Sequence, residues 1–276
     1  MLGITQGLTE FAPVSSSGHL ILVPWLFHWS ILNDTTLNKT FDVALHVGTF
    51  VGAAVYFRQD IAKYVRAWVR SIRRRSTETV DERLAWYIVA ATVPGAVAGA
   101  VLEEPIDRVL GQPWLIGIML AVFGVLLYVV DRRSTQTKRI EDLRFRQAFF
   151  IGLAQAVALQ PGVSRSGVTI TAARGVQLTR EAAARFSFLL SLPIIGGAAI
   201  YKGSKILTGS EHIPPGFTGP FVWGMVASAV SGFLVIWGLL AYLRRRSFAP
   251  FVLYRLAASV FVLSLIVTGV RSATVG

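Results

Sequence analysis

Cysteine is absent from this chain of 276 residues, and charged residues make up only 15% of it. Without cysteine the protein has neither disulfide bonds nor thiolate-ligated metal sites, and the redox compartment cannot be read from the sequence. Also absent are a Walker-type glycine loop, an H-E-x-x-H pair and a G-x-S-x-G turn. These absences argue against ATP hydrolysis and zinc proteolysis as functions of the chain.

Apolar residues are abundant. They form 53% of the chain, and the mean hydropathy is +0.57, so the chain is too apolar for an ordinary soluble domain. We therefore expect an all-α polytopic membrane protein that forms a single membrane domain over residues 1–276. The basic residues behind the net charge of +12 cluster in short loops between apolar runs, as membrane orientation signals do, and no nucleic-acid-binding motif accompanies them. We expect no nucleic-acid partner.

Six apolar runs are candidates for membrane-spanning helices, each of which needs roughly 17 to 25 residues. The fourth run is short and can borrow residues from either flank. Pro94 and Pro193 fall inside runs, where neighbouring helices can satisfy the freed backbone groups, so kinks are expected there rather than breaks. The six runs are 41–57, 84–102, 113–130, 186–201, 220–243 and 250–270.

The loops between these runs differ in charge, which orients the spans. The loop from Arg58 to Arg83 carries eight Lys or Arg, and the loop from Asp131 to Arg146 carries six. Both are expected on the cytoplasmic side. The loop from Glu103 to Gln112 has one basic residue and is expected outside. This pattern predicts six crossings with both termini outside.

Two similar segments lie about half a chain apart and carry polar residues where a spanning helix should have none. Residues 6–19 read QGLTEFAPVSSSGH and residues 155–169 read QAVALQPGVSRSGVT, which stay in step with one insertion at Gly162. The first enters from outside and the second from inside, so we expect inverted repeats over about 1–130 and 147–270. Each segment is short and ends at a proline, which predicts two re-entrant helix hairpins lining one cavity near the midplane.

The first hairpin tip brings a carboxylate, hydroxyls and an imidazole together. Gln6 and Glu10 are one helical turn apart, Ser15 or Ser16 can cap the second half-helix, and His19 follows one turn later. Ionisable groups inside membranes are costly and usually functional. Structural roles are the alternative: the serines only cap, Glu10 is a hydrogen-bonded interior acid, and His19 satisfies a carbonyl.

The second tip has the features of an anion site. Ser164, Arg165 and Ser166 follow the helix-breaking Pro161-Gly162, and Thr169 lies one turn on. Free backbone N–H groups, the helix dipole and a planar guanidinium all favour phosphate there. Alternatively Arg165 pairs with Glu10 and locks the hairpins together, and the two roles do not exclude each other. Asp42 and His46, at the outer end of the first run, either support the site or lie at a solvated helix end.

These motifs carry a family resemblance. Residues 6–20, QGLTEFAPVSSSGHL, and residues 161–169, PGVSRSGVT, resemble the bacitracin-resistance family of integral-membrane undecaprenyl-diphosphatases. That family's (E/Q)-x-x-x-E motif is matched by Gln6 and Glu10, and its P-G-x-S-R-S-x-x-T motif is matched in full. Gln6 in place of Glu is permitted by the family pattern, but it removes one acidic metal ligand or base.

The resemblance implies an enzyme that hydrolyses undecaprenyl diphosphate to undecaprenyl phosphate and inorganic phosphate. This activity would recycle the carrier lipid of cell-wall synthesis and confer resistance to bacitracin. The resemblance also implies a divalent cation, Mg²⁺ or Ca²⁺, for which Glu10 and Gln6 are the candidate ligands. It places the protein in the bacterial inner membrane with a site that faces the outer side.

Roles for the site residues follow from the resemblance and from their chemistry. Arg165 is expected to bind phosphate and to stabilise the charge of the transition state, and Glu10 to bind the cation or to act as general base. Ser16 is the expected nucleophile with His19 as its acid/base partner, although a phosphohistidine at His19 stays open. The further phosphate-binding candidates are Ser164, Ser166 and Thr169.

A secondary transporter or flippase for a lipid phosphate or an anion is the competing interpretation, because inverted repeats with broken helices are typical of secondary carriers. Transport requires charge complementarity but no acid/base and nucleophile set. The clustering of Glu10, Ser16 and His19 opposite Arg165 therefore favours an enzyme.

Overall fold

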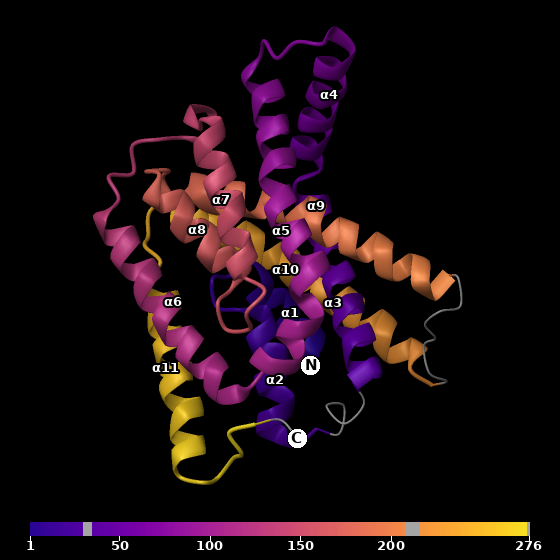
Figure 1. The fold of residues 1–276 in the computed structure, drawn as a ribbon, viewed down its shortest axis with the longest axis vertical. Coiled ribbons are helices and arrows are strands. Elements are labelled where there is room, and N and C mark those ends of the chain that lie inside the picture. The colour runs from indigo at the N-terminus through magenta and orange to yellow at the C-terminus, as the bar shows by residue number, and fades with distance from the viewer. Residues whose placement is uncertain (30–34, 208–215, 275–276) are drawn as a thin grey trace.

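The computed structural model describes residues 1–29, 35–207 and 216–274, and in these residues the chain is helical without a β-strand. Figure 1 shows the helices in chain order, coloured from indigo to yellow. Their bounds are α1 (Leu2–Phe11), α2 (Ser16–Phe27), α3 (Thr35–Tyr56), α4 (Arg58–Arg74), α5 (Val80–Leu110), α6 (Pro113–Arg133), α7 (Phe145–Val157), α8 (Arg165–Gly175), α9 (Arg180–Leu207), α10 (Thr218–Leu243) and α11 (Ala249–Val267), with a 3-10 turn at Ile140–Asp142.

Five helical segments in the described part of the chain are long and apolar enough to cross a membrane, and a sixth span results if α3 and α4 are counted together. These two helices meet at a bend of 81°. The predicted run 41–57 covers most of α3 and the following residue, and it passes as a span only together with α4. The other five spans are Val80–Leu102, Pro113–Arg133, Arg180–Tyr201, Thr218–Leu243 and Ala249–Val267.

Two of the predicted loops are helical. The basic segment after Arg58 forms α4, which ends at Arg74, and α5 continues to Leu110 through most of the expected outer loop. The N-terminus of α5 is fixed by a capping box, because Thr79 Oγ1 accepts from Glu82 N at 3.3 Å and the Glu82 carboxylate accepts from Thr79 N at 3.0 Å. The charge pattern therefore did not reveal that these segments are helical.

The outside of the helical body is apolar, as it is in proteins surrounded by lipid. Large hydrophobic side chains are strongly exposed on several long helices, for example Val97, Leu234, Trp237, Leu253 and Val260. The interior, by contrast, holds many buried polar side chains. This arrangement is that of a multi-pass membrane protein.

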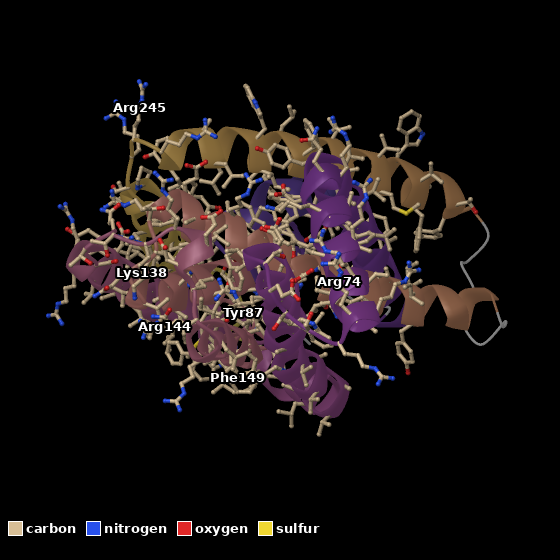
Figure 2. The ribbon with its side chains drawn as sticks, turned by 90° about the horizontal axis from the view of Figure 1, so that it is seen from above. Arg74, Tyr87, Lys138, Arg144, Phe149 and Arg245 are labelled. Atoms are coloured by element: carbon tan, nitrogen blue, oxygen red, sulfur yellow. The ribbon has the colours of Figure 1, made fainter. Side chains whose placement is uncertain are left out.

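Basic turns gather toward one end of the molecule. In the view from above, Figure 2 shows Arg74 of α4, Lys138 and Arg144 before α7, and Arg245 after α10. The N-terminus and the end of α11 lie toward the opposite, lower end in Figure 1. The basic segments thus lie toward the end opposite the N-terminus and the end of α11.

Small residues let the helices around the site pack closely. A Cβ at Gly7 of α1 would collide with Ser231 of α10. A Cβ at Gly48 of α3 would collide with Ser228, which is also on α10. A Cβ at Gly152 of α7 would likewise collide with the backbone of Ala91 in α5. Such contacts are the usual means of helix association in membranes. Here they place α1 and α3 side by side on α10.

Candidate active site

Two helix pairs, α1/α2 and α7/α8, are interrupted by the same kind of turn. Ser15 and Ser164 are the N-caps of α2 and α8, and their φ angles of 77° and 76° lie in the left-handed region, which non-glycine residues rarely adopt. Each caps in the same way: Ser15 Oγ accepts from Gly18 N at 3.3 Å and Ser164 Oγ accepts from Gly167 N at 3.0 Å. The segments that are alike in sequence thus share an unusual backbone geometry.

The two interruptions, which we call the first break (residues 12–15) and the second break (residues 158–164), are hydrogen-bonded to each other. Ser15 Oγ accepts from Gly162 N at 3.0 Å, and Ser166 Oγ donates to the Ala12 carbonyl oxygen at 3.1 Å. The hydroxyls of Ser164 and Ser166 lie 3.2 Å apart. Both side chains, predicted to bind phosphate, are therefore buried in the contact between the two breaks.

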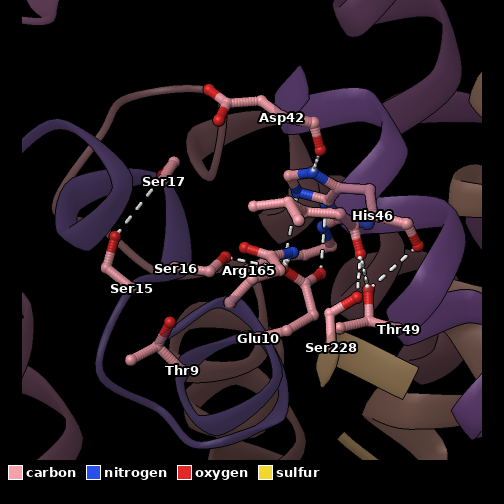
Figure 3. A network of polar contacts seen from close by, with 12 residues as sticks. Thr9, Glu10, Ser15, Ser16, Ser17, Asp42, His46, Thr49, Arg165 and Ser228 are labelled. Carbon is pink, nitrogen blue, oxygen red and sulfur yellow. Dashed lines mark hydrogen bonds and ion pairs between the residues drawn. The ribbon is translucent and has the colours of Figure 1, made fainter. Parts of the chain in front are cut away.

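Glu10 is the centre of a polar network at this contact (Figure 3). Its Oε2 accepts from Gln6 Nε2 at 3.0 Å and from Ser16 Oγ at 2.6 Å. Arg165 Nη2 lies 3.5 Å from Oε1, and His46 Nε2 lies 3.5 Å from Oε2. The structure thus brings together three of the predicted catalytic residues, from α1, α2 and α8.

Arg165 is only partly engaged by this network. Its side chain is 26% exposed, and its contact with Glu10 is loose at 3.5 Å. Its Nη1 is buried and has no hydrogen-bond partner among the described residues. Because Arg165 is also the first residue of α8, its guanidinium adds to the positive end of the helix dipole. The arrangement suits an anion that takes the remaining donors.

His46 joins the network from α3. Its Nδ1 lies 2.8 Å from the Asp42 carbonyl oxygen, which can only accept, so Nδ1 carries the proton. Nε2 then faces the Glu10 carboxylate, 3.5 Å from Oε2. The sequence had suggested His46 only as support or as part of a solvated helix end. Its approach to Glu10 depends on the packing of α1 and α3 on α10, which the sequence does not reveal.

His19 does not approach the Ser16 hydroxyl in this structure. Its Nδ1 donates to the Ser15 carbonyl oxygen at 2.7 Å, and its Nε2 lies 2.6 Å from the hydroxyl of Tyr254 on α11, with the two rings stacked. The ring thus holds the backbone of the first break at Ser15 and is itself held by Tyr254. The acid/base role predicted for His19 has no matching contact here, and Tyr254 was not foreseen.

Thr169 and Gln6 are also placed by the structure. Thr169 Oγ1 donates to the Arg165 carbonyl oxygen at 2.7 Å and lies 2.6 Å from Ser187 Oγ of α9, so it supports the first turn of α8. Gln6 is completely buried, and its Oε1 has no hydrogen-bond partner in the described part of the chain. This carbonyl oxygen is free to accept from, or to ligate, a bound group.

A pre-built metal cage is not found in the described residues, which contain no group of three or more His, Cys, Asp or Glu that could hold an ion. The oxygen ligands at the network are the Glu10 carboxylate and Gln6 Oε1. Mg²⁺ is commonly bound by one or two carboxylates together with substrate phosphates and water. These two residues therefore fit a cation that also binds the substrate.

Comparison with known proteins gives one consistent result. The model of the family "Bacitracin resistance protein BacA" matches residues 1–261. An undecaprenyl-diphosphatase of Desulforudis audaxviator is 47% identical over 268 residues, which cover 96% of this chain and 97% of that protein. Undecaprenyl-diphosphatases of Pelotomaculum thermopropionicum and Geobacter sulfurreducens are each 48% identical, over 96% of this chain and over 94% and 96% of those proteins. With its two motifs folded into one buried network, this chain belongs to the BacA bacitracin resistance family.

Proposed function

We propose that the protein removes the terminal phosphate of undecaprenyl diphosphate and so releases undecaprenyl phosphate and inorganic phosphate. The reaction returns the carrier lipid to cell-wall synthesis, and this recycling underlies resistance to bacitracin. The relatives named for this activity match nearly the whole length of the chain. A single structural observation supports it most directly: Ser16 Oγ donates to the buried Glu10 carboxylate at 2.6 Å, beside Arg165.

The same observation speaks against simple transport. A carrier of lipid phosphate or of an anion would use Arg165 and the helix dipoles. It would not need a hydroxyl that donates to a buried carboxylate, because translocation breaks no bond to phosphorus. The Glu10–Ser16 pair is the arrangement of a base with its nucleophile.

Substrate binding rests on the positive ends of two half-helices. α2 begins at Ser16 and α8 begins at Arg165, and both face the Glu10 network. Backbone N–H groups at helix N-termini bind phosphate oxygens, and the unengaged Nη1 of Arg165 supplies a further donor. The diphosphate lies here, while the polyprenyl tail stays among the apolar outer surfaces.

We assign the nucleophile to Ser16. Its Oγ attacks the terminal phosphorus while its proton passes to Glu10, and the bond from that phosphorus to the bridging oxygen breaks. Undecaprenyl phosphate leaves with the bonding electron pair. The proton moves from Glu10 to His46 Nε2, 3.5 Å away, and on to water. Arg165 stabilises the charge on the transferring phosphoryl group.

Water then completes the cycle. Glu10 takes a proton from the water that attacks the phosphoserine, the Oγ–phosphorus bond breaks, and Ser16 recovers a proton from Glu10. Glu10 thus acts as base in the attack and as acid toward the departing serine. A divalent cation held by Glu10 and Gln6 Oε1 would neutralise charge on the diphosphate when it is bound.

We place this site in a bundle of six crossings and two re-entrant hairpins, α1/α2 and α7/α8, that form an inverted repeat in the bacterial inner membrane. The repeated cap geometry at Ser15 and Ser164 supports the relation between the hairpins. The clustering of basic turns toward one end supports a site that opens to the other, outer side.

Purified protein in detergent provides the test, because no compartments exist there and transport yields no signal. Wild-type protein should release inorganic phosphate from a polyprenyl diphosphate, and Ser16→Ala should abolish the release. Ser17→Ala is the matched control, since the Ser17 hydroxyl makes no hydrogen bond with a described residue other than a long contact of 3.5 Å with Ser15 Oγ. Acid quenching during turnover should trap phosphoserine in the wild type. No release by folded wild-type protein would refute the proposed function.

A further inference from the structure

Arg255 lies on α11 and is as deeply buried as any residue that the structure describes, with 0% exposure. All of its guanidinium nitrogens donate hydrogen bonds, and every acceptor is a backbone carbonyl oxygen. The acceptors are those of Leu120 (3.0 Å, from Nε), Pro13 and Val163 (3.1 and 3.2 Å, from Nη1), and Met119, Gly162 and Val163 (3.3, 2.9 and 3.2 Å, from Nη2).

No carboxylate pairs with Arg255 among the described residues. A buried guanidinium without a counter-ion is costly, and inside a membrane protein such a charge usually marks a functional element. The protein contains a useful comparison, Arg174 near the end of α8, which is also 0% exposed but pairs with Asp131 at 2.8 Å. For Arg255, the acceptors among the described residues are all backbone carbonyl oxygens.

The carbonyl groups around Arg255 come from three separate parts of the chain. Pro13 belongs to the first break, Gly162 and Val163 belong to the second, and Met119 and Leu120 lie on α6. Carbonyls at interrupted helices lack intrahelical donors, and in a membrane interior they need another partner. Arg255 is the one side chain in the described part of the chain that donates to both breaks.

The carbonyl groups that Arg255 binds come shortly before the reacting residues in the sequence. Pro13 is three residues before Ser16, and Val163 is two residues before Arg165. A Cβ at Gly167, in the first turn of α8, would lie 3.0 Å from Arg255 Nη1. Because peptide bonds are trans, each carbonyl that points to Arg255 turns the N–H of the next residue away from it. For Val163 that residue is Ser164, the N-cap of α8.

We propose that Arg255 is a positioning residue of the active site, which holds the two breaks in register so that Ser16 and Glu10 face Arg165. The inference rests on the proposed phosphatase reaction. Arg255 touches neither Glu10 nor Ser16 and acts through the backbone that carries them. Without the Arg255 guanidinium, Ser16 moves away from Arg165. The donors at the start of α8 that bind the diphosphate stay in place.

Kinetic measurements on Arg255→Lys test the proposal. Lysine keeps the charge, but its single nitrogen cannot reach carbonyls on α6 and on both breaks. We expect kcat to fall about 10- to 100-fold, the scale for a small misplacement of reacting groups, with KM changed by less than about threefold. Arg255→Gln, which leaves no charge to bury, should lose kcat to a similar extent and serves if the lysine variant does not fold.

Arg174→Lys is the matched control, because it also disturbs a fully buried arginine but at the far end of α8. It should lower the melting temperature without lowering kcat per folded molecule by more than about twofold, since it leaves both breaks in place. If Arg255 were only structural, the two variants would lose stability and kcat in parallel. That result, or a normal kcat in folded Arg255→Lys, would overturn the proposal.

Amide hydrogen exchange gives a readout that does not depend on activity. In Arg255→Lys, exchange should rise in peptides that cover residues 12–18 and 160–167 and stay unchanged in α10. In Arg174→Lys it should rise around residues 174–180 instead. A uniform rise across the chain in Arg255→Lys would contradict a local positioning role. If the wild type proves not to be a phosphatase, this measurement still decides whether Arg255 holds the breaks.

Discussion

Glu10 acts as both base and acid in the proposed reaction. Its carboxylate accepts hydrogen bonds from Gln6 and Ser16. It also lies beside Arg165 and His46. Glu10→Gln keeps the size of the side chain but removes the proton acceptor. We expect phosphate release to fall by about 10² to 10⁴. Binding of the lipid diphosphate should survive, because Arg165 and the helix donors remain. Release, binding and melting temperature measured on one preparation would show whether chemistry or folding is affected.

Arg165 offers a second test at the scale of single groups. Arg165→Lys keeps the positive charge at the start of α8 but loses the planar pair of donors. Phosphate release should fall about 10-fold or more, which corresponds to a transition-state contact of about 1.4 kcal/mol. The comparison requires protein shown to be folded. Turnover at the wild-type rate would mean that the planar pair of guanidinium donors does not contribute to catalysis.

Variants of His19 distinguish two roles that are open for this residue. If its ring only holds the Ser15 carbonyl, His19→Asn should retain much more activity than His19→Ala, since an amide can still donate at a similar position. If His19 forms a phosphohistidine, both variants should be inactive, and the trapped phosphoenzyme should be labile to acid. Tyr254→Phe keeps the stacked ring and removes the partner of Nε2, so it should have a smaller effect than either.

The contacts of a residue could be predicted from the sequence where its partners belong to the two motifs, but not where they lie on helices distant in the sequence. The sequence predicted that Glu10, Ser16 and Arg165 would meet, because their motifs place them at the ends of short helices, and the structure brings the three side chains together. The approach of His46 to Glu10 requires α3 to lie against α1, and that contact is set by glycines of both helices against α10. Arg255 stood out in principle as a lone charge within the apolar run 250–270. Its carbonyl partners lie on three distant segments, so its role could not be read from the sequence.

At the scale of elements, polar helices were harder to predict than apolar ones. Five of the six apolar runs correspond to helices that qualify as spans by themselves. The basic segment of α4 was taken for a loop because hydropathy detects only apolar helices, and α5 was expected to end earlier than it does. The capping box that starts α5, Thr79 with Glu82, is visible in the sequence as T-x-x-E, and it could have placed the start of this helix at Val80 instead of at residue 84, where the apolar run begins.

Close packing between elements leads to a prediction about stability. Gly152 of α7 lies against Ala91 of α5, where a Cβ would collide with backbone atoms, whereas a Cβ at Gly197 of α9 would meet no described atom within 4 Å. Gly152→Ala should destabilise the protein by about 1 to 3 kcal/mol. Gly197→Ala, the matched control, should be neutral or slightly stabilising. Equal melting temperatures for the two variants would show that α5 and α7 do not pack as described.

At the scale of the whole molecule, the side on which the active site opens depends on the orientation of the bundle. The chain has no cysteine, so single cysteines report on one position each when intact cells are treated with an impermeant thiol reagent. Positions 136 and 78 are exposed and lie in the two basic segments, and position 274 is exposed beyond α11. Basic segments stay on the cytoplasmic side, so Thr274→Cys should label, whereas Gln136→Cys and Glu78→Cys should label only after the cells are opened. The reverse pattern would place the Glu10 network toward the cytoplasm and would exclude hydrolysis of carrier lipid at the outer face.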